Sequence, residues 1–285
     1  MKVRYLLCLL GLFCTSVHAQ PFFAPASLFT DDLPVFMQKS VRANRIKAVR
    51  VRSYPGSEPA GLASASSLVC LYDDYGNLRH KVEFRLNDTA RVHRYLYTHT
   101  GTLGWHTTED KLLRKSYRLG YRFDANHKTY QVKSYEVLNA QERMLIGTRH
   151  YIYDADSALV AIRHIESGRV VQTQRYAYDA QGNLITVTDE DAAGRAVRTT
   201  RISYNGQGLI ARVQTEEQNH SEAYTIQYDS RGNMIRVDWT ENQKPRGQLA
   251  YSYSPEGLLS RATRTTSSRN GALSVTTQLF EYEYN

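Results

Sequence analysis

The sequence predicts an all-β fold in which tandem β-hairpin repeats form a large curved antiparallel sheet, shell-like or barrel-like, with one short N-terminal helix. Three observations support this prediction: a motif that returns about every 25 residues, turn-forming residues at a fixed place in that motif, and a high tyrosine content. Tyrosine accounts for 21 of the 285 residues, and most of these tyrosines lie at or near the repeated motif.

The motif is clearest at Tyr178, which opens the run Tyr-Asp-Ala-Gln-Gly-Asn-Leu-Ile. We call the first residue of each copy its anchor. Successive anchors lie 24 to 30 residues apart: Tyr72, Tyr97, Phe123, Tyr153, Tyr178, Tyr204, Tyr228 and Tyr253. The copies at Tyr97, Phe123 and Tyr153 have kept only part of the motif. In six copies a glycine stands four residues after the anchor: Gly76, Gly101, Gly182, Gly208, Gly232 and Gly257.

Each copy has the pattern of one β-hairpin. The residue two before the anchor is usually apolar or aromatic, and spacing by two places both side chains on one face of a strand. The Asp or Asn after the anchor can bond back to the local backbone, and the glycine accepts a positive φ angle. An apolar run such as Leu184-Ile185 with Val187 then predicts the returning strand. A more variable loop such as 189–195 is expected to lead into the next hairpin.

Eight hairpins supply roughly 16 strands, and twisted open sheets seldom exceed about ten strands without curling. Curling would bury one face and protect the edges, so we expect a curved sheet with the anchor tyrosines packed in its core. An outer-membrane barrel is the competing architecture. Strands such as 198–204 and 222–228 disfavour it, because they mix polar side chains into both faces.

The first 19 residues have the parts of a secretory signal peptide: positive Lys2 and Arg4, an apolar run from Leu6 to Phe13, and a small residue at Ala19. We therefore expect export, with a mature chain in the periplasm, on the cell surface or outside the cell. Cys14 raises the alternative of a lipoprotein, which the large Phe13 before it disfavours. No later segment is apolar and long enough to span a membrane as a helix.

Residues 20–64 form an extension before the repeat domain, which we place at 65–285. Within the extension, 31–44 is predicted as one short helix, because Pro34 suits a first turn and Val35, Phe36 and Val41 can share one face. Residues 46–54 alternate apolar and basic side chains and predict a first strand. We expect the helix to cover the first edge of the sheet, since terminal repeats need capping.

The formal net charge is +8, and removing Lys2 and Arg4 leaves +6. That charge suits an anionic envelope surface. The basic residues are spread along the repeats without a dense run, and this pattern, together with export, argues against nucleic acid as a partner. Cys70 is the one cysteine after the predicted signal peptide, and it takes a strand position that predicts a buried small hydrophobic residue.

The motif resembles the YD repeat of the RHS and teneurin families, and the runs that begin at Tyr178, Tyr228 and Tyr72 carry the resemblance best. It covers about residues 65–285. In large members of these families the repeats form a spiralling β-sheet shell around a payload or a hollow, so the resemblance implies a shell-like sheet here. The sequence shows neither a toxin domain nor a self-cleavage motif that we can recognise, so we do not expect a toxin-delivery role from this resemblance.

No catalytic, cofactor or metal motif stands out. The histidines lack the paired short spacing of metal ligands, and the single Asp of each turn is explained as a turn former rather than a calcium ligand. Trp105 and Trp239 are the candidates for stacking against a ligand such as a sugar ring, although packing in the core or at an edge competes with that role.

These observations favour a non-enzymatic binding or structural module of the cell envelope or exterior, whose candidate partners are a glycan or a surface protein. Two alternatives stay open. One is an accessory or remnant of an RHS-type system that shields a partner polypeptide, and the other is a hydrolase of envelope polymers. The sequence does not set the oligomeric state.

Overall fold

The computed structural model describes residues 41–56, 66–85, 88–126, 128–268 and 271–284. The predicted all-β class is confirmed, because these residues form 18 strands assigned to one antiparallel sheet and only a three-residue helical segment, at 41–43. The predicted signal peptide at 1–19, and most of the predicted helix at 31–44, lie outside the described residues.

The strands run from β1 to β18 along the chain. Their bounds are β1 Ile46–Pro55, β2 Ser66–Tyr72, β3 Leu78–Arg85, β4 Asp88–Tyr97, β5 Leu103–Asp110, β6 Lys115–Phe123, β7 Thr129–Val137, β8 Arg143–Tyr153, β9 Leu159–Glu166, β10 Arg169–Tyr178, β11 Leu184–Asp191, β12 Ala196–Tyr204, β13 Ile210–Glu217, β14 His220–Tyr228, β15 Met234–Glu241, β16 Lys244–Tyr253, β17 Leu259–Ser267 and β18 Leu273–Tyr284.

The chain divides into two compact units. We call residues 95–203 with 214–220 the central unit, and the described residues of 41–94, 204–213 and 221–284 the terminal unit. In the central unit each strand from β5 to β12 pairs antiparallel with its neighbour in sequence, as the hairpin repeat predicts.

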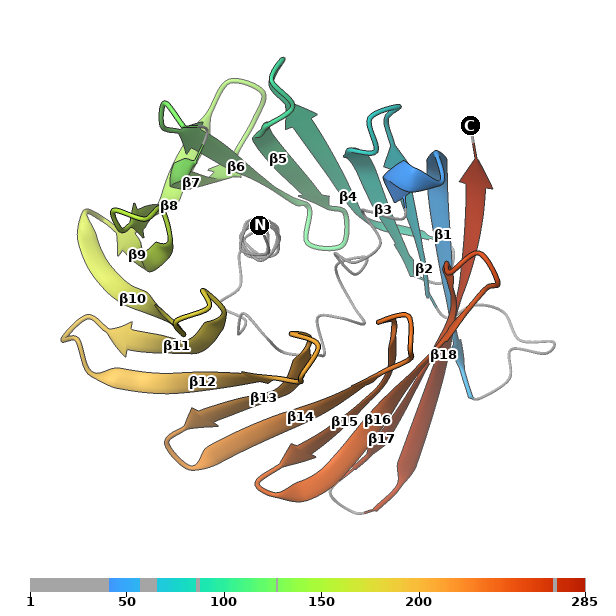
Figure 1. The fold of residues 1–285 in the computed structure, drawn as a ribbon. Coiled ribbons are helices and arrows are strands. Elements are labelled where there is room, and N and C mark those ends of the chain that lie inside the picture. Colours follow the sequence, from blue (N-terminus) through green and yellow to red (C-terminus); the bar gives the residue numbers. More distant parts are fainter. Residues whose placement is uncertain (1–40, 57–65, 86–87, 127, 269–270, 285) are drawn as a thin grey trace. The chain divides into compact units, whose positions relative to one another are not determined.

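The terminal unit joins the beginning of the repeat array to its end. Strand β1 pairs with β2 on one side and with β18 on the other, so that Val51 lies opposite both Leu68 and Phe280. Figure 1 shows β1 in blue beside the red β18. We expected the helix to cover the first edge of the sheet, but β1, the first strand, is paired on both sides and has no open edge there. The helical residue Arg42 instead donates from Nε to the carbonyl of Tyr75 in the β2–β3 turn, at 2.9 Å.

The residue after the anchor builds the hairpin turn, as predicted. In the copy that starts at Tyr178, the Asp179 Oδ1 atom accepts hydrogen bonds from the backbone N–H groups of Gln181 and Asn183, at 2.9 and 2.8 Å. The Asn183 side chain donates to the other carboxylate oxygen at 2.9 Å. Gly182 has a φ of +77°, which L-residues with a Cβ rarely adopt. Three residue types of the motif, Asp, Gly and Asn, thus build the turn together.

The same turn recurs where the motif is incomplete. In the copy at Tyr153, Ser157 takes the glycine position with a φ of +71°, and Asp154 still accepts from the N–H of Ala158 at 2.8 Å. The loop that we expected to be variable, 189–195, contains a further copy of the turn at the other end of a hairpin. There Asp191 accepts from the backbone N–H groups of Ala193 and Arg195, and Gly194 has a φ of +78°.

The anchor tyrosines connect one hairpin to the hairpin before it. Tyr178, at the end of β10, donates its hydroxyl hydrogen to the carbonyl of Leu159 at 2.8 Å. Leu159 is the first residue of β9, which is the returning strand of the preceding copy. The same bond joins Tyr153 to Thr129, Tyr228 to Ile210 and Tyr253 to Met234, and Tyr282 on β18, which is outside the eight copies, bonds to Leu259 in the same way, at 2.6 to 2.9 Å.

A β-bulge beside the anchor decides which side chains enter the core. Opposite Ala177 and Tyr178 the register of β11 steps from Thr186 to Leu184, which leaves Ile185 as an extra residue. Because of this extra residue, Leu184 and Val187 are both buried although they stand three positions apart. The same spacing buries Leu159 with Ile162 and Leu259 with Ala262.

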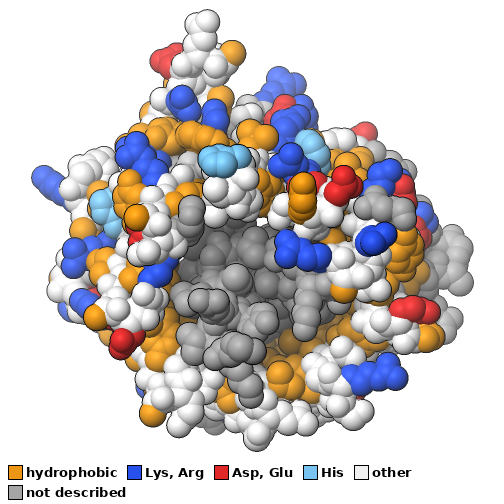
Figure 2. Space-filling model, turned by 45° about the horizontal axis from the view of Figure 1, so that its top comes forward, with side chains coloured by type: hydrophobic (Ala, Val, Ile, Leu, Met, Phe, Trp, Pro, Cys, Tyr) orange, Lys and Arg blue, Asp and Glu red, His pale blue; other side chains and the backbone are white. Residues whose placement is uncertain are grey.

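The predicted core positions are confirmed in part, because the anchors themselves, for example Tyr178 and Tyr228, are half-buried rather than buried. The residues two before the anchor include the buried Tyr95, Tyr151, Tyr176 and Tyr251, and Cys70 is buried as expected. Figure 2 shows Lys and Arg side chains spread over the visible face with acidic and hydrophobic side chains between them, rather than gathered in one block. Within the described ranges no helix has the length and apolar character that a membrane span requires.

Gly208 provides a test of the turn. Its φ is +75° and no atom lies within 4 Å of the place that a Cβ would take, so Gly208→Ala would cost about 1 kcal/mol through backbone strain alone. Gly206, in the same turn, has equally open surroundings without a positive φ. Gly206→Ala should therefore leave the midpoint of urea unfolding unchanged or slightly raised, while Gly208→Ala lowers it. Equal midpoints for the two variants would contradict this account of the turn.

Candidate functional site

A cavity of about 290 Å³ lies in the terminal unit, over strands β14 to β17. The cross-strand register explains how these residues meet, because Tyr224 lies opposite Trp239, and Trp239 lies opposite Gly247. The cavity combines aromatic, hydroxyl and charged side chains of both signs. Its lining consists of Glu222, Tyr224, Trp239, Glu241, Arg246, Leu249, Arg264, Thr266, Ser267 and Ser268.

Trp239 forms a wall of this cavity because a glycine makes room for its ring. A Cβ atom on Gly247 would lie 2.3 Å from the indole Cζ2 atom and 2.3 Å from the carbonyl oxygen of Thr265. The ring is half-buried, and the Arg264 guanidinium carbon lies 5.5 Å from its centroid. Burial lowers the pKa of Arg264 from its usual range. The structure therefore places the predicted stacking residue Trp239 in a cavity with a cation above its ring.

The two glutamates of the cavity are held by neighbouring side chains. Tyr224 donates its hydroxyl hydrogen to Glu222 Oε2 at 2.6 Å, and burial together with this bond raises the pKa of Tyr224. Arg246 Nε lies 2.7 Å from Glu241 Oε2, an ion pair whose N–H direction is not aligned as a hydrogen bond. Because acceptors, donors and an aromatic ring converge there, the cavity suits a ligand rich in hydroxyl groups.

Trp105, the second predicted stacking residue, lies on β5 in the central unit and lines none of this cavity. It too packs over a glycine, since a Cβ atom on Gly120 would lie 2.6 Å from its Cζ3 atom. The Arg118 guanidinium carbon lies 3.7 Å from the centroid of its ring. The indole is thus placed between a glycine and an arginine, which limits its contact with a further ligand.

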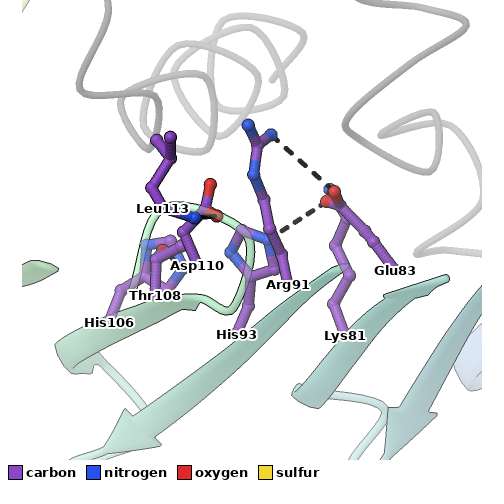
Figure 3. Close-up of polar contacts among 8 residues, drawn as sticks. All are labelled: Lys81, Glu83, Arg91, His93, His106, Thr108, Asp110 and Leu113. Carbon is purple, nitrogen blue, oxygen red and sulfur yellow. Dashed lines mark hydrogen bonds and ion pairs between the residues drawn. The ribbon is translucent and has the colours of Figure 1, made fainter. Parts of the chain in front are cut away.

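A separate polar cluster in the terminal unit surrounds Glu83 on β3. Its Oε1 atom lies 3.2 Å from Lys81 Nζ and 3.1 Å from His93 Nε2, and its Oε2 atom lies 3.8 Å from an Arg91 nitrogen. Figure 3 shows the Arg91 and His93 side chains directed toward this carboxylate. Lys81 is only 3% exposed, so Glu83 neutralises a buried ammonium group.

Burial by itself would raise the pKa of Glu83, but the hydrogen bond from His93 and the positive charge of Lys81 lower it to about 2. The cluster is explained by charge compensation inside the sheet.

In the central unit, a different buried histidine, His106, stacks on Tyr95 with 4.4 Å between ring centroids and lies 3.3 Å from the hydroxyl of Thr108. Among the described residues, no group of three or more His, Cys, Asp or Glu side chains is arranged to hold a metal ion.

The Glu83 cluster predicts a pH dependence of stability. Because the folded-state pKa is lowered, this carboxylate stabilises the fold at pH values above its ordinary pKa of 4.5, and that contribution disappears as the pH falls toward 2. Glu83→Gln should lower the free energy of unfolding at pH 7 by at most about 3 kcal/mol. Unfolding by urea at pH 7, 4 and 2.5 would measure it. The exposed carboxylate variant Glu217→Gln serves as control, and a Glu83→Gln effect that persists undiminished at pH 2.5 would contradict the assignment.

Several residues of the cavity could not be identified from the sequence. Arg246 and Arg264 are two of many arginines along the repeats, and no local motif distinguishes them. A glycine at a strand position opposite a tryptophan is a usable signal, because in both pairs the indole occupies the space that a Cβ would take. Finding the pair requires the cross-strand register, which the bulges shift.

Comparisons with known proteins give one family match and several weak structural similarities. The family model described as Teneurin YD-shell matches residues 72–270. No curated protein matches the sequence. A porin-like protein from Bacteroides uniformis has 12% identity and a TM-score of 0.44, over 84% of this chain and 98% of that one. A porin-like protein from Bacteroides vulgatus has 13% identity and a TM-score of 0.36, over 84% and 98%.

A structure of TcdB2-TccC3-TEV has 11% identity and a TM-score of 0.19, over 76% of this chain and 20% of that one. At TM-scores below 0.5, none of these three similarities supports a functional conclusion. The family match is stronger evidence than these similarities, because it covers most of the chain. The matched region also contains the anchors, the Asp–Gly turns and the tyrosine bonds between hairpins. On these grounds the chain belongs to the Teneurin YD-shell family.

Proposed function

We propose that this YD-shell protein is an exported, non-enzymatic binding module of the cell envelope or exterior, and that it binds carbohydrate through the cavity beside Trp239. The observation that carries the proposal is the combination of an indole wall with paired acidic and basic side chains in one cavity of about 290 Å³. Sugar rings place C–H groups against aromatic rings and hydroxyl groups toward charged and amide side chains. The predicted signal peptide at 1–19 supports the exported location.

The repeat architecture suits such a role. Turns and tyrosine bonds between hairpins maintain the fold, and Trp239 stands at neither of these positions of the motif. None of the lining residues is an anchor or a turn glycine. A surface protein is the other candidate partner. The two candidates are distinguished by whether the immobilised chain retains glycan or protein.

The test uses the chain from residue 20 to 285, immobilised and exposed to solubilised envelope from its own host. Retained glycan and retained protein are then identified separately. Trp239→Ala should reduce glycan retention about 10-fold or more, since loss of one aromatic contact in a cavity commonly costs that much. Tyr75→Ala removes an aromatic side chain that is 74% exposed in the β2–β3 turn and should leave retention unchanged.

Trp239→Phe keeps an aromatic ring and should retain part of the binding. All variants are compared at equal folded fraction, judged by their urea unfolding midpoints. Undiminished glycan retention by a folded Trp239→Ala protein would refute the proposal, and retention of a single polypeptide without glycan would indicate the surface-protein partner.

One observation favours hydrolysis as a second candidate function. Glu222 and Glu241 lie directly opposite each other on β14 and β15, in the same cavity, and paired carboxylates are the usual groups of glycoside hydrolysis. If the cavity cleaves the glycan that it binds, the purified chain should release reducing ends, and Glu241→Gln should abolish that release while binding persists. Binding without release of reducing ends by the unmodified chain would rule hydrolysis out.

A further inference from the structure

In the central unit, two arginines, Arg118 and Arg143, both lie over the ring of Trp105. Arg118 stands two residues before Gly120 on β6, so its side chain lies on the face that the Trp105 indole covers. Its guanidinium carbon is 3.7 Å from the centroid of the indole. Stacking of this kind holds the guanidinium in one orientation and leaves its in-plane N–H groups available as donors.

Arg143, at the start of β8, approaches the same place. Its guanidinium carbon lies 5.8 Å from the Trp105 ring and 5.6 Å from the ring of Tyr135. Tyr135 lies opposite Arg118 in the β6–β7 ladder. Burial and the positive charge of Arg143 both lower the pKa of Arg118. Two like charges are therefore held near each other beside two aromatic rings.

Within the described parts of the chain, neither arginine contacts a carboxylate. Other arginines of the central unit do: Arg198 pairs with Asp189, and Arg201 pairs with Glu216. The acidic side chains Glu109 and Glu136, on the same group of strands, pair with lysines instead. The buried Nε atom of Arg118 also has no hydrogen-bond partner among the described residues.

This arrangement has unused donors and uncompensated charge. A planar carboxylate accepts two parallel N–H bonds from one guanidinium, and a second guanidinium can satisfy its remaining lone pairs. The ring of Tyr135, which is half-buried, provides apolar surface next to the two cations. The two guanidinium groups offer donors for a single carboxylate, and the Tyr135 ring beside Arg143 offers the apolar contact that the C–H face of a sugar ring makes.

We propose that Arg118 and Arg143 bind the carboxylate of an acidic polysaccharide, with Arg118 held in place by Trp105 and the sugar ring lying against Tyr135. This site is separate from the Trp239 cavity and goes beyond the proposed function. It assigns Trp105 a positioning role beneath an arginine, in place of direct stacking against a neutral sugar. Arg143 is exposed, which gives a ligand access to the pair.

The test titrates the full chain from residue 20 with a polygalacturonate oligosaccharide, and in parallel with the same oligosaccharide after reduction of its carboxylates to alcohols. The unmodified chain should bind the acidic form at least about 10-fold more tightly. Arg118→Gln and Arg143→Gln should each remove most of that preference. Arg201→Gln, which deletes an exposed arginine that already has a carboxylate partner, loses the same charge and should change binding little.

Arg118→Lys keeps the charge but loses the stacked plane, so it should weaken binding nearly as much as Arg118→Gln. If the Arg118 variants do not fold, the exposed Arg143→Gln variant decides the matter. Trp239→Ala should leave the acidic preference intact, which separates this site from the proposed function. Equal binding of acidic and reduced oligosaccharide, equal losses in Arg143→Gln and Arg201→Gln, or tighter binding of polyglutamate than of polygalacturonate would overturn the proposal.

Discussion

The hydrogen bond from an anchor tyrosine to the first carbonyl of the preceding returning strand is the contact on which the repeat array depends. Each bond spans two hairpins, so a hairpin is fixed to its neighbour by a side chain as well as by the strand ladder. A bond of this kind contributes about 1 kcal/mol, and the repetition along the chain makes the sum substantial. Burial raises the pKa of Tyr228 to about 12, so the hydroxyl keeps its proton throughout the physiological range.

The turn and the bulge serve this bond. The Asp–Gly turn sets where the returning strand begins, and the bulge beside the anchor adds the residue that brings Leu184 and Val187 to one face. The positions that the motif leaves free are then available for binding. Trp105 and Trp239 both occupy such positions, and both depend on a glycine in the neighbouring strand to accept the ring.

Most of the architecture could be predicted from the sequence, because the motif encodes it locally. The hairpins, the turn chemistry at Asp179 and Gly182, and the strand at 46–54 all depend on neighbouring residues. The burial of Leu184 with Val187 could not be predicted by simple alternation, since a bulge changes the face. The cavity could not be predicted for the same reason. Trp239 was identified by its residue type, whereas Glu222 and Arg264 are brought beside it only by strand pairing across three ladders.

Strand β1 has a consequence for how the protein folds. Its pairing of Val51 with Phe280 closes a loop of more than 200 residues, while nearly every other ladder is a local hairpin. Loop closure over such a length is entropically costly, and non-local pairing slows folding relative to local contacts. The hairpins can form in sequence as the chain emerges, but β1 obtains its second neighbour only when β18 has been made. Until then one side of β1 presents unpaired backbone groups, and this interval is when the chain is most exposed to pairing with another copy of itself.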